Sequence, residues 1–121
     1  MSGAVTPRLP EGLRLAVEAI QDLKAVHPVV LDLRGLSDAT DYFVIASGTS
    51  DAHVRGIAER VMETLHKRGH RTHHVEGLPG GRWVLLDFVD FVVHLFHPDT
   101  RAFYQLERLW GDAPELLIRS S

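Results

Sequence analysis

The stretch RWVLLDFVDFVVHLFH, from Arg82 to His97, decides the fold of this chain. It is dense in β-branched and aromatic residues, so it predicts two adjoining strands at the centre of a sheet. Because side chains alternate along a strand, the first strand has an apolar core face of Val84, Leu86 and Phe88. Its other face carries an aromatic, an aliphatic and an acidic side chain: Trp83, Leu85 and Asp87. This second face suits a covering helix and a protein partner equally well.

The second of these strands, from Phe91 to Phe96, is apolar on both faces except for His94. That composition is typical of a strand covered on both sides. We expect His94 to be a hydrogen-bonded core histidine rather than a catalytic base, because no serine or cysteine nucleophile is implied beside it.

Length, composition and charge narrow the class of protein. The 121 residues are 45% hydrophobic and 24% charged, as in a single soluble domain. The absence of cysteine excludes disulfides, thiolate zinc sites and cysteine nucleophiles. A formal net charge of −3 argues against a general nucleic-acid binder. The N-terminus lacks a secretory signal, and no apolar run reaches the roughly 18 residues of a membrane helix. A cytoplasmic protein without membrane contact is therefore expected.

The first part of the chain predicts one helix and two strands. The helix begins at Pro10 and is stopped by Pro28. Its apolar residues recur at helical spacing: Leu13, Ala16, Val17, Ile20 and Leu23. A short strand follows at Val29–Leu33. The run Tyr42–Ala46 is apolar on both faces, so we expect it to lie centrally in the sheet.

The second helix has the clearest ends. Its apolar residues follow the 3.6-residue period: Val54, Ile57, Ala58, Val61, Met62 and Leu65. Thr49 or Ser50 supplies the N-cap, and Gly69 lies where a left-handed C-terminal cap is expected. The more polar segment His70–Glu76 predicts an edge strand.

A final helix is expected after Pro98, with Asp99 as its cap and Gly111 or Pro114 at its end. Its apolar face comprises Ala102, Phe103, Leu106, Leu109 and Trp110.

The order of these elements predicts an α/β fold, a mixed β-sheet flanked by helices, because short connections force hairpins while helix-bearing connections permit parallel crossovers. Residues 10–114 form one domain in this interpretation. Residues 1–9 carry no periodicity and are expected to be mobile, and residues 115–121 form a tail without a recognisable pattern.

A nucleotide site is the main alternative. The Gly48-Thr49-Ser50 turn before a helix resembles the phosphate-admitting turn of a nucleotidyltransferase. Such an enzyme also needs two neighbouring carboxylates, yet Asp87 and Asp90, three apart, point to opposite faces of a strand. Asp51, in the first helical turn, would repel an anion. A plain capping turn is therefore preferred, and residual nucleotide-binding or nucleotidyltransferase-like activity at Gly48–Ser50 is the alternative.

The histidines do not predict a metal site. His73 and His74 point to opposite faces of a strand, and His66 and His70 are separated by the helix-ending Gly69. We expect no metal and no cofactor.

Several motifs together resemble the ribosomal silencing factor family, RsfS, also called Iojap. They run in one order from about Leu13 to Pro114: DYFVIASGTS (41–50), HV (53–54), VEG (75–77), WVLLD (83–87), VVH (92–94), FY (103–104) and LERLWGD (106–112). The resemblance implies a nucleotidyltransferase-like α/β fold without the catalytic carboxylates, and hence a protein that is not an enzyme.

The same resemblance implies a function and a binding surface. Proteins of this family bind the large ribosomal subunit through its protein fourteen, block association with the small subunit and repress translation under nutrient limitation. The family's contact strand carries over to Trp83, Leu85 and Asp87, with Val75, Glu76 and Asp90 as neighbouring candidates. An exposed apolar face can also self-associate, so a homodimer of the free protein is a further expectation.

One position departs from the family pattern. The family usually has glycine before the Asp of the hairpin at Asp90, whereas Val89 stands here. Because a β-branched residue resists positive φ, the turn is expected to differ in type and to re-aim Asp90.

Overall fold

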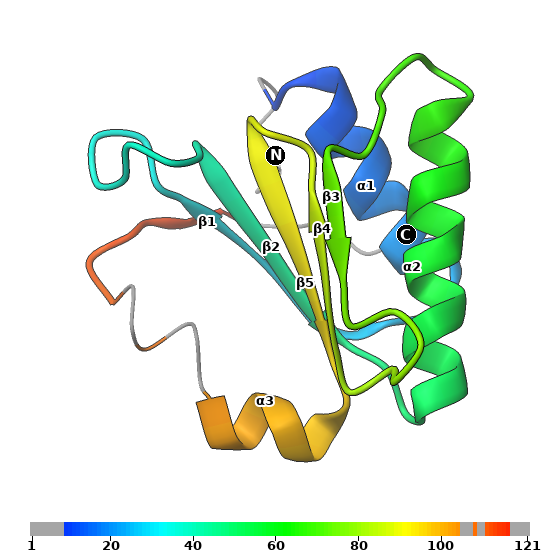
Figure 1. The fold of residues 1–121 in the computed structure, drawn as a ribbon. Helices are drawn as coiled ribbons and strands as arrows, with labels where there is room; N and C mark the ends of the chain where they lie inside the picture. Colours follow the sequence, from blue (N-terminus) through cyan, green and yellow to red (C-terminus); the bar gives the residue numbers. More distant parts are fainter. Residues whose placement is uncertain (1–8, 105–107, 109–110, 117–121) are drawn as a thin grey trace, which may run out of the picture.

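A computed structural model describes residues 9–104, 108 and 111–116, which form a six-stranded mixed sheet with helices (Figure 1). The elements in chain order are α1 (Glu11–Asp22), β1 (Val26–Asp32), β2 (Tyr42–Ser47), α2 (Asp51–His66), β3 (His74–Glu76), β4 (Trp83–Asp87), β5 (Phe91–Phe96), α3 (Pro98–Tyr104) and β6 (Glu115–Leu116). The strand order is β3-β4-β5-β2-β1-β6. Strands β2 and β5 are paired in parallel, and the other pairs are antiparallel. The predicted mixed sheet with these two strands at its centre is confirmed.

Helices α1 and α2 cover one face of the sheet, where they lie side by side (Figure 1). The alternate residues of the strands bury their side chains beneath them, as the pattern of β4 predicts. The main core joins both helices to Val30, Tyr42, Val44, Ala46, Val84, Leu86, Phe88, Phe91, Val93 and Leu95. The helical stripes predicted for α1 and α2 are buried in this core, apart from the half-buried Leu23 and Met62.

The other face of the sheet has a smaller core. Leu31, Leu33, Ile45 and Phe96 are buried there, and Val29, Phe43, Trp83 and Ala113 pack against them. Helix α3 follows the end of β5 and lies on this side, away from α2 (Figure 1). Arg101 of α3 ties the helix to the sheet, since its guanidinium donates to the Val26 carbonyl (3.2 Å) and to Ser47 Oγ (3.0 Å).

The predicted ends of α2 are confirmed. Ser50 is the N-cap, and its hydroxyl accepts a hydrogen bond from the His53 amide at 3.1 Å. Gly69 has φ +86°, the left-handed conformation expected just beyond the helix. The edge strand expected within residues 70–76 is present as β3, although it is only three residues long.

The prediction that Pro28 stops the first helix is wrong. Helix α1 ends at Asp22, and Pro28 lies inside β1. The pairing of β1 with β2 is irregular between Val26 and Val29, and His27 has φ +48°. Proline is tolerated at a bulge because its missing N–H interrupts no regular ladder bond there.

The C-terminal elements also differ from the prediction. Helix α3 begins at Pro98, so Asp99 lies in its first turn instead of capping it, and the Asp99 amide donates to His97 Nδ1 at 3.3 Å. Residues 115–116, for which the sequence has no pattern, form β6 beside β1. The expectations for Leu106, Leu109 and Trp110, and for residues 1–8 of the N-terminal segment, lie outside the described residues.

The expectation that Val89 avoids positive φ is also wrong. Val89 has φ +75° and is 56% exposed. The surrounding hydrogen bonds impose this conformation. Across the turn, the Phe88 amide donates to the Phe91 carbonyl, and the Asp90 amide donates to the Phe88 carbonyl. The Val89 amide donates to Asp87 Oδ1 at 2.8 Å. The Thr40 hydroxyl further donates to the Val89 carbonyl at 3.1 Å. The valine is therefore accommodated as backbone strain.

Replacing Val89 by glycine should stabilise the protein by about 1 kcal/mol. Removal of the Cβ relieves roughly 1–2 kcal/mol of left-handed strain, and the greater freedom of glycine in the unfolded chain offsets part of this gain. Urea unfolding measures the change. Val89→Ala, which keeps a Cβ at positive φ, should recover less than half of it. An unchanged or lower stability of Val89→Gly would contradict a strained turn.

Candidate functional site

On the face of the sheet opposite α1 and α2, which we call the second face, the burial of side chains decreases from the centre toward the β3 edge. Ile45, His94 and Phe96 are buried at the centre, Trp83, Leu85 and Asp87 are half-buried on β4, and His74 and Glu76 are exposed on β3. Strand pairing sets His74 opposite Asp87 and Glu76 opposite Leu85. We call the five residues of β3 and β4 the Trp83 surface: His74, Glu76, Trp83, Leu85 and Asp87.

Trp83 is held in place by its neighbours on β5. The indole Nε1 donates a hydrogen bond to His94 Nδ1 at 3.1 Å. The Trp83 ring also lies 5.0 Å from the ring of Phe96, measured between centroids. His94 is thus the hydrogen-bonded, buried histidine that the sequence predicts, and burial lowers its pKa to about 4.

The loop between β3 and β4 is constrained at Gly77, next to the main chain of Trp83. Gly77 has φ +77°, and a Cβ at this position would clash with the Trp83 carbonyl. Only glycine combines this conformation with so close an approach. The loop between β3 and β4 therefore packs directly on the main chain of Trp83.

The carboxylates of the Trp83 surface are partly engaged within the chain. Asp87 Oδ1 accepts the Val89 amide, and Glu76 Oε2 pairs with His74 Nε2 at 2.6 Å. Among the residues that the structure describes, Asp87 makes no ion pair. The surface thus presents an aromatic and an aliphatic side chain beside acidic groups, which is a suitable composition for a basic protein partner.

Two of the sequence-predicted site residues lie elsewhere. Val75 pairs with Leu86 and packs against the core beneath the helices, on the opposite face from Trp83. Asp90 is exposed in the turn between β4 and β5. The structure therefore brings together Trp83, Leu85, Asp87 and Glu76, but not Val75 or Asp90.

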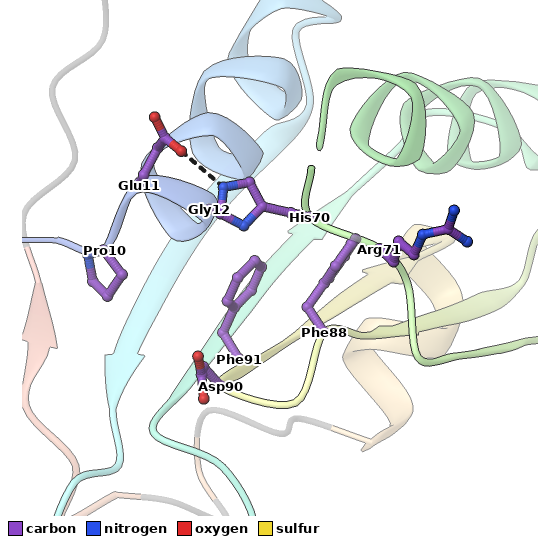
Figure 2. Close-up of a pocket in the computed structure, with 8 residues that line it drawn as sticks. All are labelled: Pro10, Glu11, Gly12, His70, Arg71, Phe88, Asp90 and Phe91. Carbon is purple, nitrogen blue, oxygen red and sulfur yellow. Dashed lines mark hydrogen bonds and ion pairs between the residues drawn. The ribbon is translucent and has the colours of Figure 1, made fainter. Parts of the chain in front are cut away.

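Asp90 borders a pocket of about 250 Å³ at the start of α1, which the sequence did not predict (Figure 2). Its lining comes from three separate segments: Pro10, Glu11 and Gly12; His70 and Arg71; and Phe88, Asp90 and Phe91. The rings of Phe88 and Phe91 stack with centroids 5.0 Å apart. Because these segments are distant in the chain, no local motif could reveal the pocket.

A carboxylate links two of the segments at this pocket. Glu11 accepts hydrogen bonds from His70 Nε2 at 2.8 Å and from the Arg68 guanidinium at 3.0 Å (Figure 2 draws the first). The hydrogen bond from His70, followed by the charge of Arg68, lowers the pKa of Glu11. This arrangement joins the start of α1 to the segment that follows α2.

The turn considered as a nucleotide site uses its polar groups internally. The Thr49 amide donates to His53 Nδ1 at 2.8 Å, and His53 Nε2 donates to the Leu23 carbonyl at 2.7 Å. A Cβ on Gly48 would approach the Val54 amide to 2.8 Å, so the turn is already packed against its own helix. These contacts are those of a capping turn.

Two further observations bear on the class of protein. In the described part of the chain, no three His, Asp or Glu side chains are grouped to hold a metal ion. Within residues 9–104, 108 and 111–116, no helix has the length and apolar character to cross a membrane.

Comparison with known proteins identifies the family. The family described as "Ribosomal silencing factor during starvation" matches residues 6–120. The ribosomal silencing factor RsfS of Halalkalibacterium halodurans is 45% identical over 104 residues, which cover 86% of this chain and 89% of that protein.

Two further matches extend the comparison. A crystal structure of a protein from Chromobacterium violaceum has a TM-score of 0.82 and 33% identity, covering 92% of this chain and 93% of that one. A mouse protein named "Mitochondrial assembly of ribosomal large subunit protein 1" is 39% identical over 74 residues, or 59% of this chain and 32% of the mouse protein. The sequence motifs, the fold and these matches agree: the chain belongs to the ribosomal silencing factor family, RsfS.

Proposed function

We propose that this protein binds the large ribosomal subunit through its protein fourteen, blocks association with the small subunit and thereby represses translation in the cytoplasm when nutrients are limiting. Membership of a family described as silencing factors during starvation supports the regulatory role. The name of the mouse relative, which refers to assembly of the ribosomal large subunit, supports the choice of subunit.

The Trp83 surface is the proposed contact. The observation that carries this assignment is the burial gradient: the second face of the sheet is closed at its centre and opens at β4, where an oriented tryptophan lies beside an aliphatic and an acidic side chain. Large aromatic residues in such surroundings are the usual anchors of protein interfaces. Val75 supports the β3–β4 pair from the helix side. Asp90, exposed in the turn that follows β4, is a candidate outside the Trp83 surface itself. The free protein would use the same surface if it forms a homodimer.

Charge complementarity supports a ribosomal partner. The chain carries a formal charge of −3, and ribosomal proteins are generally basic. Asp87 and Glu76 would meet cationic side chains around the Trp83 anchor. No chemical step is needed for this role, because a protein bound at the docking face excludes the other subunit by its volume alone.

Sedimentation with purified subunits tests the proposal. The protein should travel with large subunits but not with small ones in a sucrose gradient, and should reduce the fraction of whole ribosomes when both subunits are present. Light scattering follows subunit joining in the same mixtures. Binding to small subunits alone, or normal joining at saturating protein, would contradict the proposal.

Charge reversal at Asp87 should weaken binding in a salt-dependent way. We expect Asp87→Lys to lower the affinity for large subunits about tenfold at low ionic strength, and by less than about threefold above about 0.15 M, where the Debye length falls to about 8 Å. Affinity is measured by sedimentation across a salt series. Asp87→Asn removes the charge but retains an acceptor for the Val89 amide, so it separates charge from turn geometry.

A control for this experiment is Glu59→Lys. Glu59 is exposed on α2, on the other side of the sheet, and the substitution makes the same change of net charge. It should leave the affinity within about twofold of the parent. Equal losses from the two substitutions would indicate a general charge effect and not a contact at Asp87.

A further inference from the structure

We propose that His94 is a positioning residue for the docking surface: it fixes the Trp83 side chain in the orientation that binds the large subunit. This inference rests on the proposed function. His94 is 5% exposed, so it does not itself reach a partner, and its effect must pass through the tryptophan. Trp83 and His94 lie on adjacent strands, and their ring centroids are 6.0 Å apart.

The hydrogen bond defines the state of the histidine. An indole N–H can only donate, so His94 Nδ1 must be an acceptor and the ring proton must lie on Nε2. Burial lowers the pKa of His94 to about 4, which keeps the ring neutral and preserves this acceptor at neutral pH. The tautomer and the direction of the hydrogen bond are therefore both determined.

The histidine is not the residue that stability alone would favour. Its Nε2 is buried and has no hydrogen-bond partner among the residues that the structure describes. Among the described residues, two further aromatic rings lie beside it: the ring centroid of Phe43 is 4.5 Å from that of His94, in an edge-on arrangement, and the ring centroid of Phe96 is 6.3 Å away. A phenylalanine would fill this aromatic site without stranding a buried donor. The contribution that distinguishes histidine here is the acceptor that it offers to Trp83.

A fixed tryptophan binds better than a mobile one. A half-buried side chain that must be ordered during association reduces the affinity by the entropy that it loses, whereas a side chain already held by a hydrogen bond does not. The contact with Phe96 restrains the indole ring, and the bond to His94 selects one orientation of its N–H edge. Removing only the acceptor should therefore weaken binding while leaving the fold intact.

Two substitutions separate positioning from stability. His94→Phe keeps the aromatic ring and removes the acceptor. We expect its melting temperature to equal or exceed that of the parent, and its affinity for large subunits to fall about fivefold. His94→Asn places a carbonyl oxygen near the position of Nδ1 but loses ring volume. It should melt at a lower temperature and bind within about twofold of the parent. A purely structural role would make binding follow stability, with Asn the weaker binder.

A double-mutant cycle with Trp83→Phe provides the second measurement. That substitution removes the indole N–H, so adding His94→Phe to it should cause no further loss of affinity. In the parent background, the Trp83 indole N–H resonance should shift when His94 becomes phenylalanine and should be retained near its original position in His94→Asn.

The failures of the two proposals can be told apart. If Trp83→Ala binds large subunits as well as the parent, the proposed interface is misplaced. If Trp83→Ala releases the subunits while His94→Phe binds like the parent, the interface stands and the positioning role of His94 is overturned. Losses of affinity from His94→Phe that persist in the Trp83→Phe background would also overturn it.

Discussion

Trp83→Ala should lower the affinity for large ribosomal subunits about thirtyfold or more, which corresponds to a loss of about 2 kcal/mol. The reason is the position of the side chain. It is half-buried at the place where the second face of the sheet opens, it lies against Phe96, and its N–H is already satisfied by His94. Such an anchor contributes apolar area to an interface at a small entropic cost.

The measurement is co-sedimentation with large subunits, together with the rate of subunit joining. Trp83→Ala should be released from the large subunits and should restore joining. Circular dichroism and thermal melting show whether the domain still folds, because the substitution also removes the contact with Phe96. If the variant unfolds, Trp83→Phe, which keeps a ring there, gives the affinity of a folded protein without the indole.

Val75→Ala is the matched control. Val75 is also a half-buried side chain of the β3–β4 pair, but it faces the helices. Its truncation should reduce stability by about 1 kcal/mol and leave the affinity unchanged. If Val75→Ala releases the subunits as strongly as Trp83→Ala, the effect of both would reflect general weakening of the two strands.

Acidification should destabilise the protein by about 2 kcal/mol between about pH 7 and about pH 5 because of His94. Burial lowers the pKa of His94 from 6.5 to about 4, so the unfolded chain takes up a proton that the folded chain rejects. The contribution of a neutral His94 to the free energy of unfolding is therefore fully present above the pKa of the unfolded chain, 6.5, and is lost as the pH falls toward 4. Its ring neighbours Phe43, Trp83 and Phe96 carry no charge that could oppose this effect.

Urea unfolding at a series of pH values measures this loss, and His94→Phe is its control. The variant cannot titrate at this position, so its loss of unfolding free energy between about pH 7 and about pH 5 should be smaller than that of the parent by about 2 kcal/mol. The lowered pKa values of Glu11 and Asp32 affect stability in a more acidic pH range. These two carboxylates stabilise the folded protein until the pH falls toward their ordinary pKa values of 4.5 and 3.8. Parallel curves for the two proteins would mean that His94 is protonated equally in the folded and unfolded states.

Most of the fold was predictable because its elements bury side chains with strong periodicity. Strand β4 alternates between a buried face and a half-buried face, as the alternation in its sequence predicts, and α2 begins at the Ser50 cap. Pro28 was misinterpreted because proline in a bulge and proline after a helix leave the same local signal. Residues 115–116 gave no signal because two residues carry no period, and their place depends on pairing with β1.

The Trp83 surface was predictable to the extent that strand alternation governs it. Trp83, Leu85 and Asp87 share a face because they are two residues apart, and strand pairing adds Glu76. Val75 is adjacent to Glu76 in sequence and for that reason faces the other way. The hydrogen bond between Trp83 and His94 depends on the register of β4 against β5, which the sequence does not specify residue by residue.

The parallel pair β2–β5 has a consequence for the order of folding. Strand β1 pairs with β2, β3 pairs with β4, and β4 pairs with β5, and in each of these antiparallel pairs the two strands follow one another in the chain. Strand β2, in contrast, meets β5 only after a long excursion of the chain through α2, β3 and β4. Closing that excursion costs more chain entropy than closing any of the hairpins. Trp83 and His94 belong to one hairpin, so their hydrogen bond has low contact order. The slow steps of assembly should be the two closures that join distant segments, namely the pairing of β2 with β5 and the pairing of β1 with β6.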